Sequence, residues 1–252
     1  MQKCNDAAFC SRLRGKKNLE GYAVQAESVV VGEYDVTATV TNKADPNGTL
    51  VMRLVSYDGP ALRLHMTEKE DGKFGKKRYE VPDVLLASLD EKKVPFKLLS
   101  KSSNLLKLKL GDYTFALKYD PIRLDVSETV WETMMSWNGE KQFAFEHHRE
   151  KQEGDPEGWW EESFNSHKDS KPWGPEAISF DISWPKHSYI FGLPERATSL
   201  SLKSTVGTTH MCMHAYKHER AFSLFARLIC ENLFPLYCRR RWTANIGALP
   251  TL

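Results

Sequence analysis

Apolar residues recur at every second position in many short segments of this chain, and turn-forming residues separate the segments. The clearest case is Leu106-Lys107-Leu108-Lys109-Leu110, in which leucine and lysine alternate. Successive side chains of a strand point to opposite faces, so such a run buries one face and exposes the other. Strands of parallel sheets are buried on both faces and do not alternate in this way. We therefore predict a mainly β fold, an antiparallel β sandwich.

The expected strands fall into three groups. Residues 24–31, 34–40, 50–57 and 61–66 should form an antiparallel meander, with turns at 45–48 and 58–60, where Gly, Asn and Pro supply turn chemistry. A second group covers 96–99, 105–110, 113–119, 122–126, 130–137 and 143–147. After a charged surface loop at 149–158 and a helical turn at 159–164, strands at 178–184 and 188–191 complete the sandwich.

Charge and length limit the kinds of partner this chain can have. Of its 252 residues, 41% are hydrophobic, which is enough for the core of one β domain. Residues after Val206 include six basic and two acidic residues, a net charge of +4, whereas the remaining 29 basic and 31 acidic residues give −2. Three adjacent arginines are too small a patch for a nucleic-acid partner. No apolar run approaches the roughly 20 residues of a membrane span, so we expect no membrane span.

The chain divides near Val206 into a β-sandwich domain, 1–206, and a divergent basic tail, 207–252. Apolar residues recur at helical spacing within 216–234, which predicts one short amphipathic helix there; they are Phe222, Phe225, Leu228, Ile229 and Leu233. Three interpretations of this tail remain open. It is a membrane-surface anchor, a patch that covers the surface left exposed by a missing following domain, or a sequence never selected to fold.

Four segments in the same order carry a family resemblance over about 200 residues. They are Tyr79-Glu80-Val81-Pro82-Asp83-Val84-Leu85, Pro121-Ile122-Arg123-Leu124-Asp125, Phe145-Glu146-His147 and the stretch 160–203, which contains Lys171-Pro172-Trp173-Gly174-Pro175. Together they resemble the N-terminal β domain of glycoside hydrolase family 31, as in the glucosidase II alpha subunit. The resemblance implies a galactose-mutarotase-like sandwich. It also implies a family activity, the hydrolysis of O-glycosyl bonds that trims glucose from N-glycans.

In that family a (β/α)8 barrel follows the β domain and holds both catalytic carboxylates. Such a barrel needs roughly 250 residues, so this chain has no room for both parts. The family's nucleophile motif, Trp-Asn-Asp-Met-Asn-Glu-Pro, does not occur in the sequence. We therefore expect a non-catalytic N-terminal fragment that needs the barrel and, through the resemblance, the family's beta subunit and a glycan as partners. The alternative is a stand-alone carbohydrate-binding or regulatory module.

The resemblance also suggests a compartment and two modifications. Cys4 and Cys10 match the family's N-terminal Cys-x5-Cys, which implies a disulfide, whereas two free thiols are the alternative in a cytosolic chain. Asn47-Gly48-Thr49 is a glycosylation acceptor motif at Asn47. We expect the endoplasmic reticulum lumen if a signal peptide preceded Met1, and otherwise the cytoplasm.

The sequence predicts no catalytic residue, no substrate-binding residue, no cofactor and no metal site. Asp181 is expected to be a solvated strand residue, and Glu195 to fix a turn. In the tail His214 and His218 would share a helical face at i, i+4, but Cys212, Cys230 and Cys238 lack the paired C-x2-4-C spacing of structural zinc sites. Most tryptophans are expected in the core, with a sugar-stacking platform as the alternative; they are Trp131, Trp137, Trp159, Trp160, Trp173 and Trp184.

Overall fold

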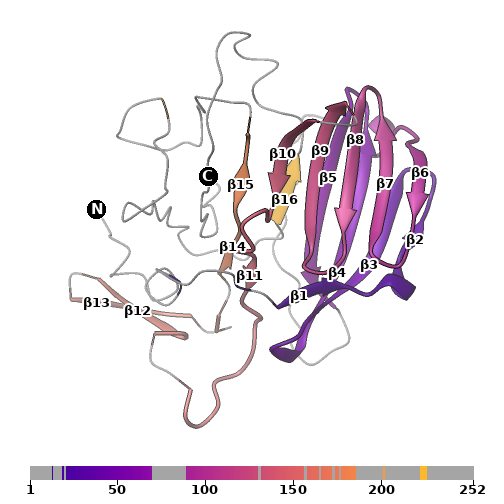
Figure 1. Cartoon of the computed structure of the whole chain (residues 1–252). Helices are drawn as coiled ribbons and strands as arrows, with labels where there is room; N and C mark the ends of the chain where they lie inside the picture. The colour runs from indigo at the N-terminus through magenta and orange to yellow at the C-terminus, as the bar shows by residue number, and fades with distance from the viewer. Residues whose placement is uncertain are drawn as a thin grey trace.

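The computed structural model contains two facing six-stranded sheets. It describes residues 13, 19, 21–69, 89–129, 132–155, 158–164, 166–171, 174–175, 177–185, 201 and 222–225. The two larger sheets lie one behind the other in Figure 1, and smaller strand pairs lie beside them. The antiparallel sandwich predicted from the alternating pattern is confirmed.

The first sheet is a meander with added edge strands. Its order is β1-β3-β4-β5-β16, and β2 also pairs with β3. The bounds are β1 Tyr22–Val24, β2 Val30–Val31, β3 Asp35–Asn42, β4 Asp45–Tyr57, β5 Ala61–Glu68 and β16 Phe222–Phe225. All of these neighbours are antiparallel.

The second sheet runs in the order β15-β10-β9-β8-β7-β6. Its strands are β6 Lys97–Lys101, β7 Leu105–Leu110, β8 Tyr113–Lys118, β9 Arg123–Thr129, β10 Glu132–Trp137 and β15 Ile182–Ser183. Two small antiparallel pairs accompany the sandwich, β11 (Ala144–Phe145) with β14 (Ile178–Ser179), and β12 (Glu161–Phe164) with β13 (His167–Ser170). Short 3-10 turns lie at η2 (Ala26–Ser28) and η4 (Leu89–Lys92).

Alternate residues of both sheets meet in one continuous core. In β7 the leucines at 106, 108 and 110 are buried, and Lys107 and Lys109 between them are exposed. The same core cluster draws residues from each sheet, and its fully buried members include Val36, Val40, Leu50, Met52, Leu54, Phe115, Leu117, Leu124 and Trp137. Burying a side chain of this size contributes about 1.5–3 kcal/mol, so the facing of the sheets is the main stabilising feature.

The strand predictions are largely confirmed, with two local differences in the first sheet. Residues 24–31 are not one strand, because η2 interrupts them; the Ser28 hydroxyl donates to the Gln25 carbonyl and accepts the Thr39 N–H. The turn expected at 45–48 lies earlier, at Lys43 and Ala44, and residues 45–48 belong to β4. Val40 of β3 pairs with Leu50 of β4, and Asn42 pairs with Asp45. Between these two pairs β3 has one residue, whereas β4 has four. The turn-forming residues therefore sit in a bulge.

The helical turn predicted at 159–164 is wrong. Residues 161–164 are strand β12, which forms a hairpin with β13, and Ser166 in the turn has φ of +68°. Local aromatic content does not reveal this pairing, because the partner strand supplies the backbone hydrogen bonds. The expected strand at 188–191 lies outside the described residues.

The helix predicted in the tail is corrected where the structure describes that segment. Within 216–234 the structure describes only Phe222–Phe225, and these four residues form strand β16, not a helix. They pair antiparallel with β5, in the register Phe222 with Met66 through Phe225 with Arg63. An edge strand with unpaired backbone groups is a ready template for such pairing, which overrides a weak local helical pattern. None of the helices in the described part of the chain has the length and apolar character to cross a bilayer.

Candidate functional site

Of three polar clusters, the first two lie on or beside strands β8, β9, β10 and β15 of the second sheet. The first is built on Asp181, which precedes β15 and is fully buried. Its two carboxylate oxygens accept the backbone N–H groups of Glu140 and Gln142, at 2.7 and 3.0 Å. The expectation that Asp181 is solvated is wrong, because a loop 40 residues earlier in the chain folds over it.

That loop, residues 138–143, depends on Asp181 and Asn138 together. The Asn138 amide nitrogen donates to the Ile122 carbonyl at 2.6 Å, and its amide oxygen accepts the Phe143 N–H at 2.8 Å. Asn138 has φ of +56° and Lys141 has φ of +58°, so the loop reverses through left-handed backbone. Asparagine tolerates this region better than most residues. The Asn138 backbone N–H also donates to the Asp181 carbonyl.

Burial raises the pKa of the Asp181 carboxyl above its ordinary value, and the backbone hydrogen bonds from Glu140 and Gln142 oppose this effect. A raised pKa is often a sign of a catalytic acid. Here both oxygens already accept hydrogen bonds from the fold, and the side chain is fully buried. Asp181 therefore organises a loop, and it offers no surface to a substrate.

The second cluster, which we call the Asp125 cluster, contains Lys118, Arg123, Asp125 and Ser136 on β8, β9 and β10. One oxygen of Asp125 accepts from the Arg123 guanidinium and the Ser136 hydroxyl, each at 2.6 Å. The ammonium of Lys118 lies 3.2 Å from the other oxygen. Side chains of Lys118 and Arg123 are 51% and 33% exposed, so solvent and small ligands reach this cluster.

Burial acts to raise the pKa of Asp125, but hydrogen bonds from Ser136, Arg123 and Lys118 outweigh it and lower the pKa. Asp125 is consequently ionised at neutral pH and cannot serve as a proton donor. The cluster presents charged donors around a fixed carboxylate. Such an arrangement can bind a polar ligand but supplies no general acid.

The third cluster holds the loop after β11 against a pair of tryptophans. The guanidinium of Arg149 makes two hydrogen bonds with Asp155, of 2.7 and 2.6 Å. Its central carbon lies 4.5 Å from the Trp160 ring centroid and 5.3 Å from that of Trp159. The Trp160 indole N–H donates to the Arg149 carbonyl. The loop predicted at 149–158 is confirmed over its described residues, 149–155 and 158, but the sequence gave no sign of this anchor.

Gly174 closes this cluster from the other side. It has φ of +78°, and a Cβ atom there would lie 2.5 Å from the Trp160 indole nitrogen and 2.6 Å from the Arg149 carbonyl oxygen. Only glycine permits this approach. The Trp-Gly step that helped to reveal the family resemblance thus has a structural reason in the packing around Trp160.

The tryptophans that the structure describes do not form an open sugar-stacking platform. Trp137 is buried in the core and Trp160 is 8% exposed. Trp159 is stacked with Trp160, with ring centroids 6.2 Å apart, and shares the Arg149 guanidinium. Trp131 and Trp173 lie outside the described residues.

Other residues for which the sequence made a prediction also lie outside the part of the chain that the structure describes. Cys4, Cys10 and Glu195 are among them, as are the histidines and cysteines of the tail. Asn47 lies on β4, but its side chain is not described. Across the described ranges, no three potential metal ligands converge. The disulfide, the glycosylation site and the absence of catalytic, substrate-binding and metal residues stay predictions.

Comparison with known proteins places this sandwich in a family. The family described as "Glycosyl hydrolase 31 N-terminal galactose mutarotase-like domain" matches residues 51–224. The chain belongs to this family. The match spans all three polar clusters, the second sheet and the hairpin β12–β13, and in the first sheet it covers the second half of β4, all of β5 and most of β16.

The relatives of this family domain are larger proteins. The chain is 30% identical to the "Probable glucan 1,3-alpha-glucosidase" of Arabidopsis thaliana, over 90% of this chain and 27% of that protein. It is 29% identical to the "Neutral alpha-glucosidase AB" of Mus musculus, over 81% of this chain and 25% of that protein. The chain thus spans about a quarter of the length of these relatives.

Solved structures show the same fold. A crystal structure of a glucosidase II alpha subunit with Tris bound superposes with a TM-score of 0.71 at 24% identity, over 82% of this chain and 25% of that chain. A heterodimeric complex of an ER glucosidase II catalytic subunit with the binding domain of its regulatory subunit gives a TM-score of 0.69 at 24% identity, over the same shares.

The Asp181 loop makes the first testable prediction. Asp181→Ala removes the acceptor of two backbone N–H groups and should lower the free energy of unfolding by about 2–3 kcal/mol, the cost of leaving such groups unsatisfied. Urea denaturation measures the change. The exposed Asp112, in the turn between β7 and β8, provides the control Asp112→Ala, which should stay within about 0.5 kcal/mol of the parent. Equal effects of the two substitutions would contradict this role of Asp181.

The Arg149 and Asp155 pair predicts a dependence of stability on pH. Hydrogen bonds from Arg149 lower the pKa of Asp155 from 3.8 to about 2. A carboxyl group with a lowered folded-state pKa stabilises the fold above 3.8, and this contribution is lost as the pH falls from 3.8 to about 2. Asp155→Asn should therefore cost stability at pH 6 and much less at pH 2.

Urea denaturation of both proteins across this range is the measurement. Glu153→Gln, in the same loop and exposed, is the matched control. A stability difference between parent and Asp155→Asn that stays constant from pH 6 to pH 2 would show that the pair does not stabilise the fold.

Proposed function

We propose that this chain acts as the non-catalytic N-terminal β domain of an α-glucosidase that trims glucose from N-glycans. The observation that carries the proposal is the family match over residues 51–224, combined with relatives named as α-glucosidases. In this role the sandwich supports a catalytic barrel, which supplies both catalytic carboxylates. A regulatory beta subunit is the expected further partner, as in the solved heterodimeric complex.

The chemistry of the described carboxylates supports the non-catalytic role. Retaining glycosidases need two carboxyl groups about 5–5.5 Å apart that face one sugar ring, one of them able to donate a proton. Asp181 is buried with both oxygens engaged, and Asp125 is held ionised by Arg123 and Lys118. Neither can act as a proton donor to a bound glucoside.

A stand-alone carbohydrate-binding or regulatory module is the second candidate. The exposed Arg123 and Lys118 beside Asp125 favour it, because charged donors and a carboxylate are suited to sugar hydroxyls. The state of the described tryptophan pair weighs against it, because the Arg149 guanidinium already lies over Trp159 and Trp160.

An activity assay tests the first candidate. The purified 252-residue chain, incubated with p-nitrophenyl α-glucoside, should release product at the rate of buffer alone, and a purified full-length relative serves as the positive control. Calorimetric titration with a glucosylated oligosaccharide should give no saturable heat. Turnover well above buffer would refute the non-catalytic role, and saturable binding without turnover would favour the module.

Residence in the endoplasmic reticulum lumen is part of the proposal and makes a further prediction. When the chain is directed into the secretory pathway, Cys4 and Cys10 should resist alkylation until a reductant is added. Asn47 should carry a glycan, so that deglycosylation shifts the mass of the parent but not that of Asn47→Gln. Free thiols at both cysteines in secreted material would exclude the disulfide.

A further inference from the structure

The edge strand β6 differs from every other strand of the second sheet, because all five of its residues are exposed. Within the described residues it pairs with β7 alone, so its other edge presents unpaired backbone N–H and C=O groups. Figure 1 shows β6 at the end of the second sheet that lies farthest from β15. Such an edge can accept an added strand from another polypeptide.

Unpaired lysines lie on the outer face beside this edge. Lys97 of β6 is directly opposite Lys109 of β7, and Lys107 follows two positions along β7 on the same face. Within the described part of the chain, none of the three makes an ion pair or hydrogen bond, whereas the neighbouring Lys118 is paired with Asp125. The turn residue Asp112 is exposed and forms no ion pair with them.

This arrangement costs stability, since like charges directly opposite on adjacent strands repel each other. A purely structural sheet gains nothing from placing Lys97 against Lys109. The repulsion does discourage a second copy of the chain from pairing edge to edge, because that would bring further lysines together. The same lysines attract a strand that carries acidic side chains. The edge therefore binds an acidic strand in preference to a second copy of itself, which gives specificity.

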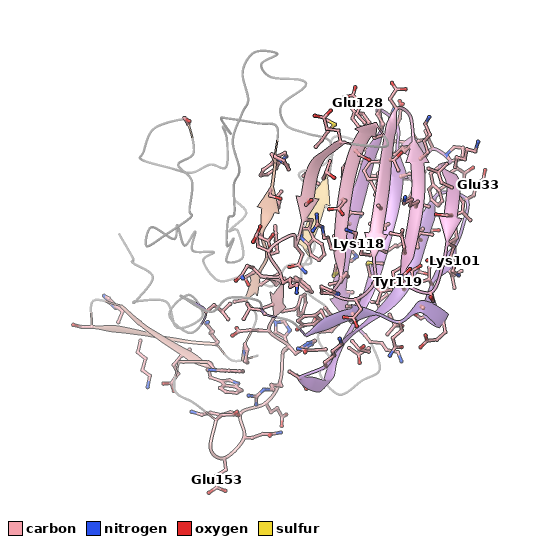
Figure 2. All side chains as sticks on the ribbon, in the orientation of Figure 1. Glu33, Lys101, Lys118, Tyr119, Glu128 and Glu153 are labelled. Atoms are coloured by element: carbon pink, nitrogen blue, oxygen red, sulfur yellow. The ribbon has the colours of Figure 1, made fainter. Side chains whose placement is uncertain are left out.

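Apolar side chains are also exposed at the same edge. Leu98 faces the inner side, opposite Leu108, yet it is 45% exposed, and the bulge residue Leu99 is 44% exposed. Lys101 reaches across to the Val29 carbonyl at 2.7 Å and so fixes this edge to the first sheet. Figure 2 shows Lys101 at this edge, far from Glu153 in the loop that follows β11.

We propose that the free edge of β6 binds an extended acidic segment of a partner protein, which adds to the second sheet as a further strand. Its acidic side chains alternate with apolar ones. The carboxylates face Lys97, Lys107 and Lys109, and the apolar side chains lie against Leu98. Three lysines on and beside the edge strand are too few for nucleic acid, which needs a larger basic footprint.

Fluorescence anisotropy with synthetic peptides and the 252-residue chain tests this site. The probe is a labelled nine-residue peptide in which Glu and Val alternate. A block peptide of the same composition, five Glu followed by four Val, should bind about tenfold more weakly, because it cannot place every charge on one face. Raising the salt from 50 to 300 mM should weaken the binding of the alternating peptide, because exposed charges are screened.

Variants of the chain locate the binding. Lys107→Glu combined with Lys109→Glu should weaken binding about tenfold, as expected for the loss of two exposed ion pairs and the repulsion that the two new carboxylates add. Lys92→Glu combined with Lys151→Glu makes the same change of charge at exposed positions outside β6 and β7, and it should leave the affinity unchanged. Lys109→Glu alone should not lower the midpoint of thermal unfolding, because it relieves the repulsion with Lys97.

Several outcomes would overturn the proposal. They are the absence of saturable binding, equal binding of the block and alternating peptides, and equal effects of the two double variants. Displacement of the peptide by heparin or anionic vesicles at equal charge concentration would show a general polyanion surface instead of a strand site. None of these outcomes bears on the proposed non-catalytic role of the chain, because β6 is separate from the Asp181 and Asp125 clusters.

Discussion

The burial of one sheet face against the other is the interaction on which this structure depends. The core cluster draws on β3, β4 and β5 of the first sheet and on β7, β8, β9 and β10 of the second. Neither sheet can bury its apolar face alone, and an isolated hairpin is marginally stable in water. Strand register matters for the same reason, because a slip by one residue would turn the leucines of β7 outward and its lysines inward.

Polar residues then connect the irregular segments to this core. The Tyr22 hydroxyl donates to the Phe145 carbonyl, and burial raises the pKa of Tyr22 to about 12, so the hydroxyl remains a neutral donor. Hydrogen bonds to Asp181 hold the loop at 138–143, and hydrogen bonds from Arg149 hold the loop at 149–155. Backbone groups of these loops have no sheet partner, and buried groups of this kind need an acceptor or donor. Asp181 and Arg149 therefore serve the fold.

The sequence predicted the sandwich well because strand alternation is a local signal. The leucine and lysine run identified β7 with its bounds, and the resemblance pointed to the correct family. Asp181 was misjudged because its partners, Glu140 and Gln142, are about 40 residues away in the chain, and no local pattern encodes that distance. The hairpin β12–β13 and strand β16 were missed for the same reason, since pairing with another strand decided each of them.

The two edges of the second sheet show that core packing alone does not determine the chemistry of a sandwich. Ile182 and Ser183 of β15 are both buried, so the chain itself covers that edge. At the opposite edge every residue of β6 is exposed, and Lys101 is turned inward to reach the first sheet. Inward-pointing and outward-pointing lysines both prevent an edge from pairing with its own copy. Core packing requires no charge at Lys97, Lys107 and Lys109. These lysines are better explained by selectivity, because they repel a second copy of this edge and attract a strand with acidic side chains.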